Sequence, residues 1–325
     1  MKNTCEKIWK ENEYTYKAAY GFIPEINSYL HDDEEIRDCM IVVPGGGYCM
    51  CVPPEGEVVA KVFYEQGMNV FVLTYTTDIT FSVPLKRQPM EDISRAVRYI
   101  RYRNKEYHID KKRLFICGFS AGAHVCGSLA VHFDDIKDPD TSLDKISNSP
   151  NGVILSYPVI TTGKYTHEFS VEALLGKDPS KEELDYFSLE KQVSEVTPPC
   201  FIWQTQTDDL VPVENSYMFA KALKEKGIMF AHYVFPNGIH GLSVANDDFF
   251  NGVFGEPYTM KQVFAAVDAV KAGKGVDVSE KRKSELEIQF GDDAPAQPEY
   301  KHDENLRYEV GLWPKLARIW MNRIH

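Results

Sequence analysis

An α/β fold, with a doubly wound and mostly parallel sheet that helices cover on both faces, is the architecture that this sequence predicts. Short apolar runs of strand length alternate along the chain with longer segments whose apolar residues recur at helical spacing. Such alternation is typical of parallel sheets whose strands are joined by helical crossovers. The 325 residues are 43% hydrophobic and 26% charged, which is ordinary for a globular protein with a sizeable core.

The predicted elements follow one another in a regular order. Six apolar runs are predicted as strands: 39–43, 69–75, 113–117, 152–157, 200–206 and 230–235. Helical spacing predicts helices over 55–66, 90–107, 121–133 and 213–226. In a sheet of this kind, reactive side chains are expected in the loops that follow the carboxyl ends of the strands.

Three regions of the chain differ in composition. Residues 1–246 hold all the predicted strands and are expected to form the core. The region 247–304 has a helical pattern over 260–271 and then becomes charged and rich in Pro and Gly. We expect it to be an insertion or extension, partly flexible, that forms a lid or a dimer contact. In 305–325, apolar residues recur at helical spacing, which predicts a final helix that completes the core.

The net charge of −12 comes from 36 basic and 48 acidic residues. A chain this acidic is not expected to take nucleic acid or an anionic membrane as its main partner. The N-terminal residues lack an apolar run of signal-peptide length, and no stretch is long and apolar enough to span a membrane. We therefore expect a cytoplasmic protein.

The seven cysteines are scattered, and most of them lie in apolar runs. Their odd number and placement predict buried free thiols rather than a disulfide framework. Cys49 and Cys51 form the one close pair, and no further cysteine or histidine stands near them at metal-ligand spacing. We expect no metal.

The stretch CGFSAGAH (117–124) places Ser120 between two glycines, after a predicted strand and before a predicted helix. Glycine at 118 and 122 is expected where a side chain would collide with the neighbouring backbone. A G-x-S-x-G motif in this strand–turn–helix context is the nucleophile elbow of α/β-hydrolases, which lifts the serine hydroxyl clear of the sheet. We therefore expect Ser120 to be a catalytic nucleophile.

A serine nucleophile needs a base, which is usually a histidine oriented by an acid. In α/β-hydrolases the acid and then the histidine follow the serine along the chain. His240 lies in a glycine-flanked loop after the last predicted strand and is the predicted base, whereas His124 on the elbow helix is expected to be structural. Asp208 and Asp209 both follow the preceding strand, and spacing alone does not choose between them.

The stretch PGGGY (44–48) follows the first predicted strand. Three consecutive glycines allow backbone N–H groups to converge on one point, as an oxyanion hole requires. We expect Gly46 or Gly47 to supply one donor and Ala121, the residue after the nucleophile, to supply the second.

With these residues in place, the sequence resembles the acetyl esterase/lipase group of α/β-hydrolases, close to bacterial acetyl-xylan or feruloyl esterase-like proteins. Further stretches that carry the resemblance are MEDISRAVRYIR (90–101), SYPVI (156–160) and VPVENS (211–216). In such proteins the acid stands four residues before the proline of the V-P-V motif, which implies Asp208. The resemblance also implies a structural role for Asp92. Three features depart from the group: Pro44 opens the glycine loop, 247–304 is longer than usual, and 76–86 lacks the usual arginine.

The resemblance implies a cofactor-free serine esterase that hydrolyses short acyl esters, acetyl above all, of a carbohydrate or another small alcohol. Tyr48, Tyr157 and Pro158 are candidate pocket residues, and a homodimer is left open. Two alternatives use the same fold: a prolyl-oligopeptidase-like peptidase, and a non-catalytic binding protein. The sequence offers no propeller-like region before residue 40 and retains every type of triad residue, and both facts favour the esterase.

Overall fold

The computed structural model describes residues 1–291 and 303–324. Eight strands form one sheet in the order β1-β2-β4-β3-β5-β6-β7-β8. Neighbours from β4 to β8 run parallel, whereas β1–β2 and β2–β4 are antiparallel. The strand bounds are β1 Cys5–Lys7, β2 Glu25–Tyr29, β3 Arg37–Val43, β4 Asn69–Thr74, β5 Ile109–Phe119, β6 Gly152–Ser156, β7 Cys200–Thr205 and β8 Phe230–Phe235. The predicted fold class, an α/β protein with a doubly wound and mostly parallel sheet, is confirmed.

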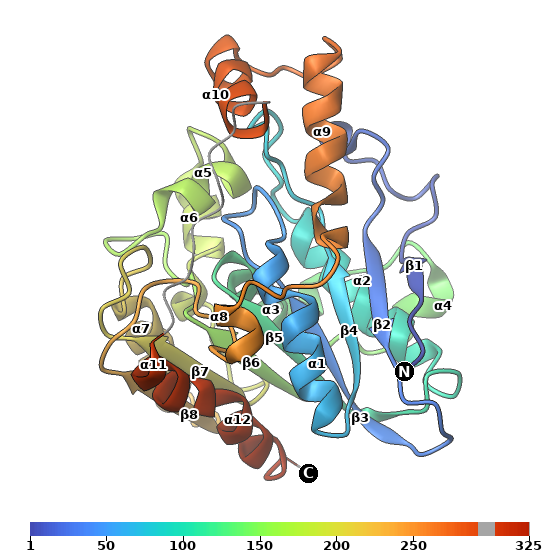
Figure 1. Ribbon diagram of the computed structural model, residues 1–325, viewed down its shortest axis with the longest axis vertical. Helices are drawn as coiled ribbons and strands as arrows, with labels where there is room; N and C mark the ends of the chain where they lie inside the picture. Colours follow the sequence, from blue (N-terminus) through green and yellow to red (C-terminus); the bar gives the residue numbers. More distant parts are fainter. Residues whose placement is uncertain (292–302, 325) are drawn as a thin grey trace.

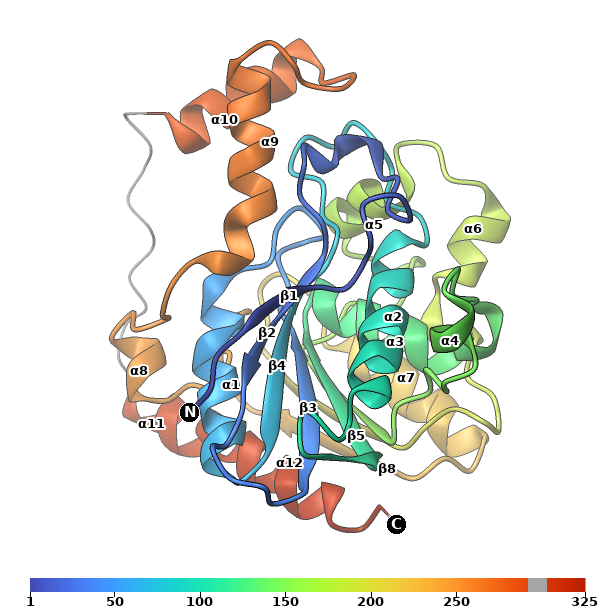
Figure 2. The same ribbon diagram turned by 90° about the vertical axis from the view of Figure 1, so that its right-hand side faces the viewer.

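Helices cover both faces of this sheet (Figures 1 and 2). Apolar residues of α1 and α12 pack on one face, and those of α2, α3 and α7 pack on the other. The α-helices are α1 Glu57–Glu65, α2 Gln88–Tyr102, α3 Ala121–His132, α4 Thr141–Asp144, α5 Glu168–Leu175, α6 Lys181–Tyr186, α7 Glu214–Glu225, α8 Asp247–Phe250, α9 Lys261–Lys271, α10 Glu280–Phe290, α11 Glu304–Glu309 and α12 Trp313–Met321. No helix within 1–291 or 303–324 combines the length and the apolar character needed to cross a membrane.

The central strands β3, β4 and β5 are buried on both faces, which explains their continuous apolar sequences. In the pairing of β3 with β5, Val43 lies opposite Gly118. The loops that follow these two strands therefore begin side by side. One loop carries the three glycines and the other carries Ser120, so this register sets the first two parts of the site next to each other.

The C-terminal helix α12 buries Trp313 against the sheet. Its indole ring stacks on Trp203 of β7 with ring centroids 5.3 Å apart and lies 5.9 Å from Phe119 of β5. The indole N–H donates a hydrogen bond of 2.8 Å to the carbonyl of Ser243. Because Ser243 follows His240 by three residues, α12 also holds the loop of the predicted base in place.

Several segments differ from the sequence prediction, which also lacked the short helices α4, α5, α6 and α8. The strands β1 and β2 lie upstream of the first predicted strand, where short and partly polar sequences gave no strand signal. The charged, Pro- and Gly-rich part of 247–304, for which no helix was predicted, contains the helix α10, which Ser279 caps through its side chain and which buries Leu286. Residues 292–302 of that region lie outside the described residues.

The seven cysteines are free, and all except Cys5 are buried. Cys39 and Cys117 lie in the central strands β3 and β5, and Cys126 lies in α3. These side chains fill apolar space between the sheet and its helices, as small hydrophobic residues do.

Candidate active site

Ser120 lies at the sharp turn between β5 and α3, with backbone angles φ 52° and ψ −117°. This conformation is strained for a residue with a side chain. The turn can close because glycines flank it: a Cβ atom on Gly118 would lie 2.3 Å from the carbonyl oxygen of Gly122. A Cβ atom on Gly122 would lie 2.2 Å from the carbonyl oxygen of Val43, so both positions require glycine.

Three predicted side chains meet at this turn. The Oγ of Ser120 lies 2.8 Å from the Nε2 of His240. The Nδ1 of the same ring lies 2.9 Å from Oδ2 and 3.1 Å from Oδ1 of Asp208. The side chain of Asp208 is fully buried and that of His240 is 12% exposed, so the histidine is the member of the pair that solvent reaches.

Asp208 and Asp209 have separate positions. The Oδ1 of Asp208 accepts the backbone N–H groups of Leu210 and Val211, at 3.0 and 2.9 Å. Burial opposes ionisation of Asp208, but the hydrogen bonds from His240 and from these N–H groups outweigh burial and hold its pKa below the usual value. Asp209 instead accepts the backbone N–H of His240 at 2.9 Å. Asp208 therefore contacts the imidazole ring, and Asp209 contacts the loop that carries it.

The glycine loop after β3 lies beside Ser120. Gly46 and Gly47 have φ angles of 126° and 62°, and a Cβ atom on Gly46 would lie 2.5 Å from the carbonyl oxygen of Met50. Within the described residues, the backbone N–H groups of Gly46, Gly47 and Ala121 have no protein acceptor. Gly46 and Gly47 line the cavity at Ser120, and Ala121 directly follows Ser120, so these N–H groups can donate to an external oxygen.

Glu55 is a buried carboxyl group that the sequence analysis did not single out. Its Oε2 accepts the N–H of Gly45 at 2.6 Å, and its Oε1 accepts the O–H of Tyr157 at 2.7 Å. The phenol oxygen of Tyr157 in turn accepts the N–H of Ser243, and the Tyr157 ring meets the His240 ring edge-on at 4.8 Å. Burial raises the pKa of Glu55, although its two hydrogen bonds and the nearby His240 oppose this. Glu55 thus links the glycine loop to the histidine loop.

The predicted pocket residues lie behind the site rather than at its surface. Tyr48 is buried, and its hydroxyl group bonds the Nδ1 of His124 at 2.7 Å. The Nε2 of His124 bonds the carbonyl of Phe187, and burial lowers the pKa of this histidine to about 4. Among the described residues, those that line the cavity at Ser120 do not include Tyr48, Tyr157 or Pro158. These three candidate pocket residues are buried in the layer behind the cavity, where hydrogen bonds hold the side chains of Tyr48 and Tyr157.

The cavity at Ser120 has a volume of about 610 Å³. Its wall is formed by the glycine loop, the 50–55 segment, α5 and the histidine loop. The residues that line it are Gly46, Gly47, Met50, Val52, Pro53, Pro54, Glu55, Ser120, His167, Phe169, Leu210, His240, Gly241 and Met260. Apolar side chains predominate, and the polar groups gather at Ser120, as is usual for a small-molecule site.

The model of the BD-FAE family matches residues 29–223, which is more than half of the chain. The chain belongs to the BD-FAE family. Its resemblance to acetyl esterase-like α/β-hydrolases is thereby confirmed.

Three proteins to which this BD-FAE protein is similar have names that refer to xylan, xylosides or acetyl esters. A crystal structure of an acetyl ester-xyloside bifunctional hydrolase from Caldicellulosiruptor lactoaceticus is 33% identical, with a TM-score of 0.71, and the match covers 84% of this chain and 97% of the other. The endo-1,4-beta-xylanase B of Butyrivibrio fibrisolvens is 65% identical over 83% of this chain, and the acetylxylan esterase of Xylanibacter ruminicola is 29% identical over 62%. The chain spans only 42% and 40% of the lengths of these two curated relatives.

Replacing Glu55 with glutamine is expected to lower the free energy of unfolding by about 1–3 kcal/mol, because one of its two partners would then face a donor instead of an acceptor. The glycine loop and His240 would also shift, so kcat should fall on the order of tenfold or more. Urea unfolding and ester hydrolysis measure the two effects. Glu57→Gln is the matched control, since Glu57 is partly exposed and contacts Tyr29 and Lys61 instead of the site. Equal effects from both variants would show that Glu55 has no special link to the site.

Proposed function

We propose that this chain is a serine esterase that releases short acyl groups, with acetyl preferred, from an esterified carbohydrate or another small alcohol. The observation that carries the proposal is the continuous set of hydrogen bonds from Ser120 through His240 to Asp208. Ser120 and His240 also line the cavity of about 610 Å³. A hydroxyl group in contact with a base that a carboxylate orients is the arrangement that nucleophilic acyl transfer requires.

In the first half of the proposed reaction, the Oγ of Ser120 attacks the ester carbonyl carbon while its proton passes to the Nε2 of His240. Asp208 holds the proton on Nδ1 and stabilises the imidazolium ion that forms. The C–O bond to the alcohol then breaks, and His240 returns the proton to the departing oxygen. The product is an acyl-enzyme on Ser120, and a water molecule releases the acid by the same steps with His240 as the base.

The negative oxygen of the tetrahedral intermediate needs donors that are already in place. The N–H of Ala121 belongs to the residue directly after the nucleophile, and the N–H groups of Gly46 and Gly47 border the same cavity. We assign the oxyanion hole to Ala121 with Gly46 or Gly47. Positive φ angles at both glycines favour this assignment, since they turn successive N–H groups in a way that other residues rarely allow.

The preference for a short acyl group and a carbohydrate draws on the relatives. The solved relative is named an acetyl ester-xyloside bifunctional hydrolase, and one curated relative is named an acetylxylan esterase. The aromatic side chain of Phe169 lies beside the glycine loop: a Cβ atom on Gly47 would lie 2.8 Å from its ring. The ring therefore forms part of the cavity wall beside this loop.

Hydrolysis of p-nitrophenyl esters with acyl chains of increasing length tests the proposal. We expect kcat/KM to be highest for the acetyl ester and to fall by roughly tenfold or more at eight carbons, in line with the acetyl esters in the names of two relatives. Acetylated xylo-oligosaccharides are the second substrate set, with released acetate as the readout. An equal or rising rate for long acyl chains would contradict the preference, and no turnover of any ester by folded protein would contradict the esterase.

A further inference from the structure

The hairpin formed by α9 and α10 projects beyond the rest of the molecule at one end (Figures 1 and 2). It belongs to the region 247–304, whose role the sequence left open between a lid and a dimer contact. Two polar anchors join the hairpin to the loop after β4. Gln262 on α9 bonds both the N–H and the carbonyl of Thr77, and the guanidinium of Arg282 on α10 donates to the carbonyl of Ile79 at 2.6 and 2.8 Å. The hairpin is therefore fixed to the core beside the site.

An aromatic pair connects this anchor to the catalytic cavity. The guanidinium of Arg282 lies 4.9 Å from the centre of the Phe81 ring, and Phe81 meets Phe169 edge-on at 4.8 Å. Phe169 is 47% exposed and lines the cavity at Ser120. It also lines a second cavity of about 420 Å³, between Phe81, α5 and the start of α10. The two cavities thus share the Phe169 side chain as a common wall.

The second cavity combines aromatic rings with polar groups of balanced charge. Three cationic side chains and three carboxylates border it, together with the hydroxyl groups of Thr80, Ser82 and Ser279. The charged residues are Lys177, Lys281 and Arg282 against Glu172, Asp277 and Glu285. Because the formal charges cancel, the cavity has no net attraction for an anion or a cation. A neutral ligand with apolar faces and many hydroxyl groups matches it, and a sugar ring has both features.

We propose that this second cavity is a sugar-binding site that holds a further residue of an acylated oligosaccharide while its ester group lies at Ser120. The inference rests on the proposed esterase function and extends it to an oligomeric substrate. The hairpin then serves as a substrate-binding wall: α10 supplies Lys281, Arg282 and Glu285, and the turn before it supplies Asp277. Phe169 lies where the substrate would pass from one cavity to the other.

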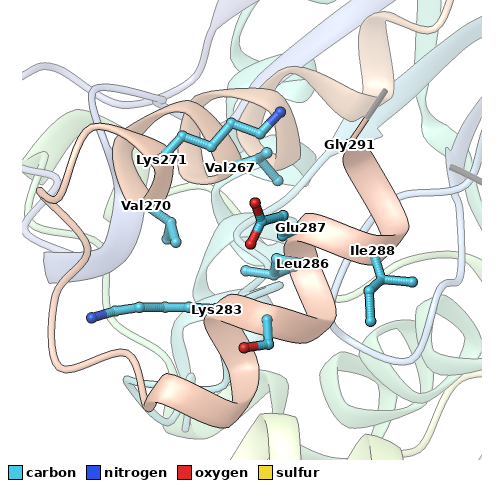
Figure 3. A pocket seen from close by; sticks show the side chains of 9 residues that line it. Val267, Val270, Lys271, Lys283, Leu286, Glu287, Ile288 and Gly291 are labelled. Atoms are coloured by element: carbon cyan, nitrogen blue, oxygen red, sulfur yellow. The ribbon is translucent and has the colours of Figure 1, made fainter. Parts of the chain in front are cut away.

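The hairpin also offers a matched control surface. A separate cavity lies between α9 and α10, and its lining includes Lys271 and Lys283 (Figure 3). None of the residues that line it also lines the second cavity. Two lysines in the lining of either cavity can therefore be changed to alanine, and both double variants change the net charge by the same amount.

The test compares the double variant Lys177→Ala/Lys281→Ala with the control Lys271→Ala/Lys283→Ala. For each protein, kcat/KM on an acetylated xylotriose is divided by kcat/KM on p-nitrophenyl acetate. We expect this ratio to fall roughly tenfold in the first variant through a higher KM for the trisaccharide, because two hydrogen-bond donors are lost. The control should retain the wild-type ratio.

Two results would overturn the second site: an unchanged ratio in the first variant, or an equal fall in the control. Failure of the esterase proposal has a different signature, because p-nitrophenyl acetate itself would then not be hydrolysed by the wild type. The two proposals are therefore tested by different numbers from the same experiment.

Discussion

Ser120→Ala is expected to lower kcat for p-nitrophenyl acetate on the order of 10⁵- to 10⁶-fold, since removal of a serine nucleophile leaves only binding and oxyanion stabilisation. The change removes one oxygen atom, which bonds His240 at 2.8 Å, and it adds no atom to the crowded elbow. Folding should therefore be retained, which thermal unfolding monitored by circular dichroism can establish. Steady-state hydrolysis at high enzyme concentration measures the remaining rate.

Ser128→Ala is the matched control for this experiment. Ser128 is also buried, lies on the same helix α3, and its Oγ approaches the Nδ1 of His124 at 3.4 Å. Its loss should leave kcat within a few-fold of the wild-type value, because its hydroxyl group contacts His124 rather than the side chains of Ser120, His240 or Asp208. A Ser120→Ala protein that keeps more than about one hundredth of wild-type activity would assign the nucleophile to another residue.

Asp208→Asn is expected to lower kcat on the order of 10³- to 10⁴-fold, whereas Asp209→Asn should cost less than about tenfold. An asparagine at 208 can place its NH₂ group against the ring and so favour the wrong tautomer of His240. At 209 the amide oxygen can still accept the backbone N–H of His240, which is the bond that the carboxylate makes. The two variants have the same chemistry at neighbouring positions, so they control for each other in one kinetic measurement. Comparable losses would reject the assignment of Asp208 as the acid.

The elbow was predictable from sequence because its geometry permits few residues. Gly118 and Gly122 face backbone oxygens at less than 2.5 Å from any added Cβ, so the spacing G-x-S-x-G is a direct consequence of close packing. The positions of the six predicted strands along the chain followed from their apolar runs for a similar reason, since parallel strands buried on both faces tolerate few polar residues. The placement of Ser120 and His240 side by side then follows from the loops at the carboxyl ends of β5 and β8.

Other features depend on long-range contacts that leave little local trace. Asp208 and Asp209 have identical side chains, and only the fold distinguishes them. The path of the histidine loop brings the His240 ring to Asp208, 32 residues before it, and the His240 backbone N–H to Asp209, 31 residues before it. Glu55 looks like one of many surface glutamates until the fold brings Gly45 and Tyr157 to its two oxygens. The strand β2 forms because it pairs with β4, and its own residues give little strand signal. The helix α10 is stabilised by its cap at Ser279 and by the burial of Leu286.

The low reactivity expected of the native cysteines makes this protein suitable for labelling at a single introduced cysteine. Burial raises the pKa of each of the six interior thiols far above neutrality, and burial together with Glu25 raises that of Cys5 to about 11. At pH 7 almost no thiolate is present, and the thiolate is the form that reacts with maleimides and iodoacetamides. The six buried thiols are thus expected to react slowly with such reagents, and the raised pKa of the exposed Cys5 slows its reaction as well. A single cysteine introduced at Ile288, which is 71% exposed on α10, can carry a fluorophore or a spin label and report on the hairpin as substrate arrives.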